Sequence, residues 1–108
     1  MSHVGGLQPA RGGRKRGEVR LYYDAKSVNW VAGTNRMGIW AEVRIDAHYL
    51  TPAEAGEDVL IDSEGKSKVF ISQKRLYRIV RHQGGYGKHL LSLTLFDPDV
   101  ECYSFTFG

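Results

Sequence analysis

The feature that most constrains this chain is a two-residue alternation of apolar and polar side chains, which begins at Glu18 and continues almost to the C-terminus. The clearest stretch is residues 39–46. One set of alternate positions there is apolar, and the other set is Trp40, Glu42, Arg44 and Asp46. Successive side chains of a β-strand point to opposite faces of a sheet, so this stretch predicts a strand that is buried on one side.

Similar runs occur along the rest of the chain, at residues 19–23, 27–32, 68–72, 75–82, 88–96 and 100–107. Residues 84–87 predict a hairpin loop, and Asp97-Pro98-Asp99 predicts a tight turn. Residues 51–55 predict a short helical turn with a threonine cap. Seven or eight short strands separated by turns favour an all-β fold, a two-sheet β-sandwich of the jelly-roll or galactose-binding-like type.

In such a sandwich, the apolar faces of both sheets form one core. The residues expected on these inner faces are Val28, Ile39, Val43, Ile45, Leu76, Leu91, Leu93, Leu95, Tyr103, Phe105 and Phe107.

The length of 108 residues suits one domain. Residues 1–17 contain five glycines, four basic residues and no acid, so they carry +4, and the remaining 91 residues sum to −1 given the net charge of +3. This composition predicts a disordered basic tail or linker over residues 1–17 and a β-sandwich domain over residues 18–108. The basic tail would attract nucleic acid unspecifically, so no specific nucleic-acid partner is expected.

Cys102 is the single cysteine, which excludes a Cys-x-x-Cys redox centre and predicts a small buried apolar residue. No apolar run reaches the roughly 18 residues of a membrane span. No hydrophobic stretch follows the N-terminal basic residues, so no signal peptide is visible. We therefore expect a cytoplasmic protein if the chain is free-standing, and a cell-envelope protein if it is a fragment of an exported parent.

Trp40 is the main candidate for ligand contact, because the alternation places it on the polar face with Glu42 and Arg44. An outward-facing tryptophan beside polar groups suits stacking on a sugar ring, but the same arrangement suits a protein interface or local packing. Tyr22 on a neighbouring strand and Tyr86 in the glycine-rich loop are secondary candidates.

Asp58, Asp62 and Glu64 lie near Glu54 and Glu57 and are weak calcium candidates, since Ca²⁺ prefers several oxygen ligands. The alternative is a solvated acidic loop whose aspartates bond to their own turns. His82 and His89 flank the glycine-rich loop and are expected to approach each other, although two histidines do not complete a metal site. We see no nucleophile, so no enzyme activity, cofactor or metal is expected.

Three segments in the second half carry a resemblance: Gly56-Glu-Asp-Val-Leu-Ile-Asp-Ser-Glu-Gly65, Arg75-Leu-Tyr-Arg-Ile-Val-Arg81 and Phe96-Asp-Pro-Asp-Val-Glu-Cys-Tyr-Ser-Phe-Thr-Phe-Gly108. They resemble the C-terminal carbohydrate-binding-module-like domain of DipZ-type thioredoxin-like proteins, which are associated with cytochrome c biogenesis. Asp46 followed by a turn resembles the same family's Val-x-hydrophobic-Asp-Gly segment. The sequence departs from the pattern at Asp99, where the family has glycine, and at Cys102, where it has alanine.

The resemblance implies a non-catalytic accessory domain, normally fused behind a thioredoxin domain that carries the Cys-x-x-Cys pair. The partners it implies are a carbohydrate, a thioredoxin-like domain or a second copy of the chain. A sandwich that resembles sugar-binding modules need not bind sugar, so these alternatives stay open.

Overall fold

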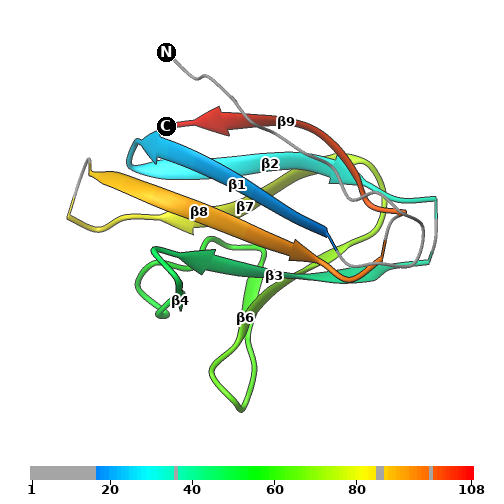
Figure 1. Ribbon diagram of the computed structural model, residues 1–108, viewed down its shortest axis with the longest axis horizontal. Coiled ribbons are helices and arrows are strands. Elements are labelled where there is room, and N and C mark those ends of the chain that lie inside the picture. Colours follow the sequence, from blue (N-terminus) through cyan, green and yellow to red (C-terminus); the bar gives the residue numbers. More distant parts are fainter. Residues whose placement is uncertain (1–16, 36, 85–86, 98) are drawn as a thin grey trace.

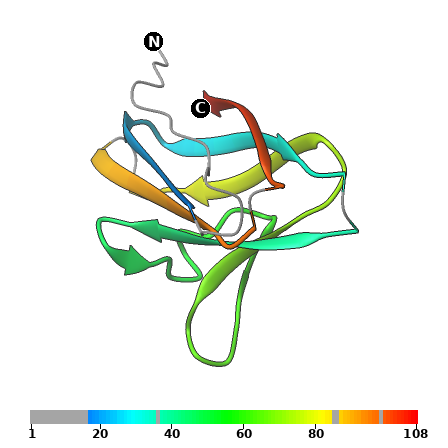
Figure 2. The same ribbon diagram turned by 45° about the vertical axis from the view of Figure 1, so that its right-hand side comes forward.

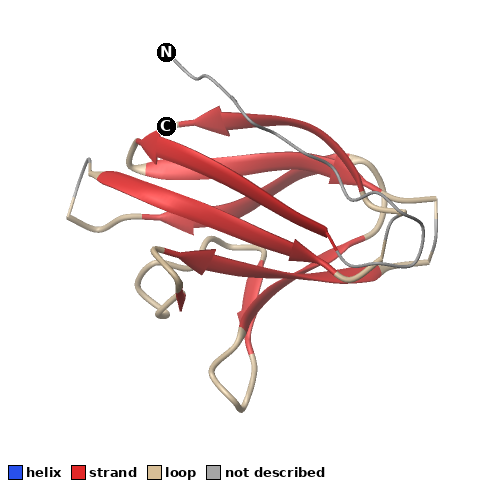
Figure 3. Cartoon of the chain, in the orientation of Figure 1, coloured by secondary structure: helices blue, strands red, loops and turns tan. Residues whose placement is uncertain are grey.

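The alternating segments fold into β-strands in the computed structural model, which describes residues 17–35, 37–84, 87–97 and 99–108. The described part of the chain contains no helix, as Figure 3 shows, and the all-β prediction is confirmed. Its strands are β1 (Gly17–Asp24), β2 (Ser27–Gly33), β3 (Ile39–Ile45), β4 (His48–Tyr49), β5 (Val59–Ile61), β6 (Ser67–Ile71), β7 (Arg75–Arg81), β8 (Lys88–Leu95) and β9 (Glu101–Phe107). Residues 1–16, which make up most of the expected tail, lie outside the described part.

The strands form two antiparallel sheets. The larger sheet has the order β1-β8-β3-β6-β5, with β4 paired to β3, and the smaller sheet has the order β7-β2-β9. The sheets lie against each other as two layers (Figures 1 and 2). The predicted β-sandwich is therefore confirmed, whereas the jelly-roll and galactose-binding-like labels stay predictions. The shortest strands, β4 and β5, were not predicted, because two or three residues are too few to show an alternation.

The core lies between the two sheets and is centred on Trp30 of β2. Trp30 is fully buried and stacks on Phe105 of β9, with 6.2 Å between ring centroids and 9° between ring planes. The inner face of β3 is also fully buried or nearly so, as its alternation predicted. Most residues expected inside are there: Val28, Ile39, Val43, Ile45, Leu91, Leu93, Leu95 and Phe105 are buried, and Phe107 packs partly buried against them.

Two expected core residues, Leu76 and Tyr103, are instead exposed. The cause is a β-bulge on either side of β2. Tyr103 is the unpaired extra residue of β9, because Val31 pairs with Ser104 and Ala32 with Cys102. The bulge in β7 turns two consecutive residues inward, so Ile79 and Val80 are both buried and Leu76 is left on the outer side.

Residues 51–55 form the single helical turn that the sequence predicted. The amide of Ala55 donates to the carbonyl of Thr51 at 3.0 Å, and the amide of Thr51 donates to Oε1 of Glu54 at 3.0 Å. The capping therefore comes from the Glu54 carboxylate, which also accepts a hydrogen bond from the Thr51 hydroxyl at 3.3 Å. The turn does not continue, because Ala55 forms a bridge with Val80 of β7.

The hairpin between β3 and β4 turns over Asp46 and Ala47, which have φ angles of 51° and 70°. Among the described non-glycine residues, these two are the ones with positive φ. Two-residue hairpins favour this type I′ geometry, and glycine fits it without steric cost. Ala47 thus occupies a conformation that disfavours its Cβ.

We predict that Ala47→Gly raises the free energy of unfolding by about 0.5–1 kcal/mol, since relief of left-handed strain outweighs the greater entropy of glycine in the unfolded chain. Urea unfolding measures the change. The matched control is Ala53→Gly in the exposed 51–55 turn, where φ is negative and the same substitution should destabilise. A lower stability for Ala47→Gly would contradict the proposed strain.

We predict that Phe105→Ala lowers the free energy of unfolding by about 3–5 kcal/mol, because it removes the ring that stacks on Trp30 and leaves a cavity. Tyr22→Ala, at a residue 80% exposed, should change stability by no more than about 0.5 kcal/mol. Chemical unfolding of both variants tests the register of β9. A stability of Phe105→Ala equal to that of the parent chain would show that this register is wrong.

Candidate binding surface

The outer face of the larger sheet carries the side chains that the sequence singled out on β3. Ile39, Ala41, Val43 and Ile45 point into the core, so the intervening residues of β3 point away from it. Trp40 keeps 41% of its surface exposed. The prediction that Trp40 lies on the side opposite to the core is confirmed.

The sheet register places Phe70 of β6 directly opposite Trp40. The two rings are in contact, with centroids 5.0 Å apart and planes tilted by 56°. Phe70 is 45% exposed, and Leu60 on the adjacent strand β5 is 55% exposed. Leu60 pairs with Lys68, which makes it a diagonal neighbour of Phe70 on the same face. We call these three residues, Trp40, Phe70 and Leu60, the Trp40 patch.

The absence of a side chain at Gly38 leaves room for the Phe70 ring. A Cβ at position 38 would collide with the end of the Phe70 ring, so the ring lies directly over the backbone there. Met37, the preceding residue, is almost fully exposed. Phe70 was not singled out from the sequence, although the alternation of residues 68–72 carried the signal: Val69 and Ile71 are buried, so Phe70 must face outward.

Lys68 sits between the Trp40 patch and a neighbouring acidic turn. Its ammonium lies 5.1 Å from the centroid of the Trp40 ring and 3.3 Å from Oδ2 of Asp62. A cation over an aromatic face is attracted electrostatically by the quadrupole of the ring, whose π face is negative. Lys68 therefore holds Trp40 in place and occupies part of the ring face that a sugar would use.

Glu42 and Arg44, the other two candidates on β3, make contacts within the protein. The hydroxyl of Tyr49 on β4 donates to Glu42 Oε1 at 2.9 Å, and this bond raises the pKa of Tyr49. Arg44 Nη2 donates to Thr94 Oγ1 at 2.9 Å, and its guanidinium lies 5.6 Å from the Tyr49 ring centroid. Within the described part of the chain, the buried Nε of Arg44 has no hydrogen-bond partner.

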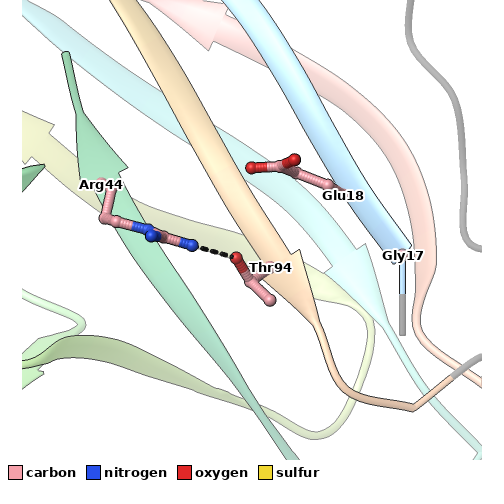
Figure 4. Close-up of a pocket in the computed structure, with 4 residues that line it drawn as sticks. All are labelled: Gly17, Glu18, Arg44 and Thr94. Atoms are coloured by element: carbon pink, nitrogen blue, oxygen red, sulfur yellow. Dashed lines mark hydrogen bonds between the residues drawn. The ribbon is translucent and has the colours of Figure 1, made fainter. Parts of the chain in front are cut away.

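A shallow polar hollow lies on the outer face of the larger sheet (Figure 4). Gly17, Glu18, Arg44 and Thr94 line it, from β1, β3 and β8. Thr94 pairs across the sheet with Glu42, which is two residues from Trp40 on the same face of β3. The patch and the hollow are therefore neighbouring parts of one outer sheet face.

Tyr22 shares this face but does not belong to the same site. Its cross-strand partner on β8 is Leu90, whose carbonyl accepts from the amide of Asp46. Tyr22 thus lies level with Asp46, six residues from Trp40, which corresponds to about 20 Å along a strand. Tyr22 therefore lies on the expected face, but strand β8 and this distance separate it from the Trp40 patch. A role of Tyr22 in ligand binding stays a prediction. Tyr86 lies outside the described residues.

The three acidic calcium candidates bond to separate groups. Asp58 accepts from Arg75 Nη2 at 3.0 Å and from the amide of Arg78 at 2.7 Å. Burial alone would raise the pKa of Asp58, but these hydrogen bonds outweigh it and lower the pKa. Asp58 therefore fastens the segment before β5 to β7.

Asp62 instead closes the turn between β5 and β6. Its Oδ1 accepts from the amides of Lys66 at 3.0 Å and Glu64 at 2.9 Å, which lowers its pKa. Glu64 forms an ion pair with Lys66 at 3.5 Å. Nowhere in the described residues do three His, Cys, Asp or Glu side chains gather as a metal site would require. Asp62 matches the alternative in which an aspartate bonds to its own turn, whereas Asp58 bonds to β7.

Cys102 packs half-buried against the core. Burial raises the pKa of its thiol to about 11, so the thiol is protonated at neutral pH. The thiolate is the reactive form of cysteine, and Cys102 is therefore a poor nucleophile. Within the described segments, no helix is both long and apolar enough to cross a membrane.

The two packed antiparallel sheets define a single all-β sandwich domain with a mixed aromatic and polar outer face. The family profile described as "Thioredoxin like C-terminal domain" matches residues 6–108, and the chain belongs to this family. Family membership supports an accessory domain of a thioredoxin-like protein. Comparison with curated proteins and with solved structures gave no significant match.

Proposed function

We propose that this chain is a non-catalytic accessory domain that binds a protein partner through the Trp40 patch, and that the partner is the thioredoxin-like domain implied by its family. The observation that carries the proposal is the contact of two half-exposed aromatic rings, Trp40 and Phe70, on the outer sheet face. In thioredoxin-like proteins of the DipZ type, which this sequence resembles, that domain would precede the β-sandwich and supply the Cys-x-x-Cys chemistry.

The composition of the patch favours a protein over a sugar. Tryptophan, phenylalanine and methionine are enriched at protein interfaces, and contiguous exposed apolar groups on a soluble domain mark interaction sites. Leu60 extends the apolar surface beyond the aromatic pair. A sugar-stacking platform needs an open, flat ring face, but Lys68 lies over Trp40 and the Phe70 plane is tilted by 56°.

The backbone beneath the patch is rigid, which favours binding. Trp40 and Phe70 project from paired strands inside the larger sheet, and Phe70 rests on Gly38. Lys68 is fixed by Asp62, whose turn is closed by two amide hydrogen bonds. A surface that is already ordered loses little conformational entropy on association.

We predict that titrating the chain with a thioredoxin-like domain of the same family shifts the tryptophan emission to shorter wavelength, because docking removes Trp40 from water while Trp30 is already buried. Trp40→Ala should weaken the association by about 10-fold or more, as expected for an aromatic anchor at an interface. Isothermal titration calorimetry measures the affinity of the variant.

Tyr22→Ala is the matched control, since it removes an exposed aromatic ring from the same face outside the patch. It should leave the affinity unchanged. Equal affinities of Trp40→Ala and the parent chain, or no association at all, would contradict the proposal. Sedimentation of the chain alone tests the remaining alternative, which is self-association with a second copy covering the patch.

A second candidate, carbohydrate recognition, is favoured by the polar hollow beside the patch. Glu42, Arg44 and Thr94 place polar groups on the same outer face as the Trp40 ring. If this candidate is correct, a glycan panel should give binding that both Trp40→Ala and Arg44→Ala abolish, with thermal unfolding unchanged for Trp40→Ala. Arg44 lies outside the Trp40 patch, so its substitution should spare protein docking. Binding that survives Trp40→Ala would exclude the sugar site.

A further inference from the structure

Four polar side chains meet at one end of the sandwich, away from the Trp40 patch. Tyr23 comes from the end of β1, Asp46 from the turn after β3, His82 from the residue after β7, and His89 from the start of β8. Figure 1 shows this end at the left, where these strands and the C-terminus come together. The cluster therefore joins both sheets of the sandwich.

The contacts form a continuous chain. The hydroxyl of Tyr23 lies 2.7 Å from Nε2 of His82. The rings of His82 and His89 are stacked, with centroids 4.4 Å apart and 15° between their planes. Nδ1 of His89 lies 2.7 Å from Oδ2 of Asp46, whose Oδ1 accepts from the amide of Leu90 at 2.9 Å. The expected approach of His82 and His89 is confirmed. The expected hairpin over residues 84–87 is wrong, because β7 pairs with β2 in the smaller sheet while β8 pairs with β1 and β3 in the larger one.

The cluster also holds the C-terminal end of the chain. The amide of His82 donates to the carbonyl of Lys26 at 2.6 Å, and the amide of Lys26 donates to the carbonyl of Gly108 at 3.1 Å. Phe107 stacks on Tyr23, with 6.4 Å between ring centroids. A change at His82 is thereby transmitted to the β1–β2 turn and to the last residues of β9.

One protonation pattern that satisfies these contacts at neutral pH keeps Tyr23 as the donor to His82. Burial raises the pKa of Tyr23, and the negative charges of Asp46 and Glu54 raise it further, so Tyr23 stays a phenol. It then donates to an unprotonated Nε2 of His82, whose proton is on Nδ1. His89 donates its Nδ1 proton to the Asp46 carboxylate. Stacked, parallel rings do not direct their nitrogen lone pairs to one point, which argues against metal binding by the pair.

We propose that Tyr23, His82, His89 and Asp46 form a pH-sensitive latch, which holds the C-terminal end of the sandwich in place at neutral pH and loosens it in mild acid. Protonation of His82 places a positive charge in this partly buried cluster and reverses the hydrogen bond, so that Nε2 donates and the Tyr23 hydroxyl must turn to accept. It also brings a second positive charge against the stacked ring of His89 when that ring is protonated.

The charged groups around the latch set the direction of the effect. Burial lowers the pKa of His82 below its ordinary 6.5, His89 lowers it further, and Glu54 and Asp46 act in the opposite direction. The folded chain therefore binds fewer protons at His82 than the unfolded chain does. The contribution of His82 to stability is complete above pH 6.5 and declines as the pH falls below it.

Asp46 contributes to stability in a different, more acidic pH range. The hydrogen bond from His89 lowers the pKa of Asp46 below 3.8, with smaller contributions from the Leu90 amide, the charge of His89 and the charge of His48. Its contribution to stability is present above that value and is lost at lower pH. Loss of stability between about pH 6.5 and pH 5 is therefore assigned to His82.

Amide hydrogen exchange by NMR tests the latch. Protection factors of Lys26, His82 and Gly108, corrected for the intrinsic pH dependence, are measured between about pH 7.5 and pH 5. In the parent chain we expect them to fall at the lower pH while those of β3 and β8 are retained. In His82→Gln, which has no titratable ring, we expect them to be independent of pH.

His48→Gln is the matched control, because His48 is exposed and hydrogen-bonds to the neighbouring Tyr49 carbonyl rather than to the cluster. It should behave like the parent chain. His89→Gln serves as a second variant if His82→Gln does not fold, and it should reduce the pH dependence, because it removes the charge of His89 beside His82. Constant protection in the parent chain, or an undiminished loss in a foldable His82 or His89 variant, would overturn the latch. A pKa of the His82 ring above 6.5, measured by NMR titration, would also overturn the proposal.

Discussion

The structure depends on covering one apolar side of the larger sheet. The inner side chains of β3 and β8 are buried, and an aliphatic surface of this extent is stable in water when a second layer removes it from solvent. The smaller sheet supplies that layer, with Trp30 stacked on Phe105 at its centre. Because the strands alternate, filling the core with Ile39, Ala41 and Val43 forces Trp40 and its neighbours to the opposite side.

The polar groups stabilise this arrangement at its ends and turns. Asp58 fastens the segment before β5 to β7, and Asp62 closes the β5–β6 turn and pairs with Lys68. Lys68 in turn lies over Trp40, and Phe70 lies over Gly38. The carboxylates that looked like calcium ligands are thus part of the support for the aromatic surface. The Tyr23–His82–His89–Asp46 cluster closes the sandwich end at which the C-terminus lies.

Alternation along single strands was sufficient to predict the sandwich, most of its core and the outward side of Trp40. It failed where the backbone departs from a period of two. The β7 bulge turns Ile79 and Val80 inward and leaves Leu76 outside, and the β9 bulge leaves Tyr103 outside. It also could not give the order of strands within a sheet. That order makes Phe70 and Leu60 neighbours of Trp40 and leaves Tyr22 far away. Sites formed by side chains on different strands depend on this order, so the sequence predicted one member of the patch and missed the other two.

We propose that the outer sheet face is an interface with a thioredoxin-like domain. Hydroxyl-radical footprinting with mass spectrometry tests this most directly, because it reports the solvent access of single side chains in the chain alone and with that domain added. If the outer face is this interface, oxidation of Trp40, Phe70 and Leu60 falls when the domain is added, whereas oxidation of Tyr22 and Tyr103 stays the same. Unchanged oxidation of Trp40 and Phe70 in a mixture shown to contain the complex would contradict it.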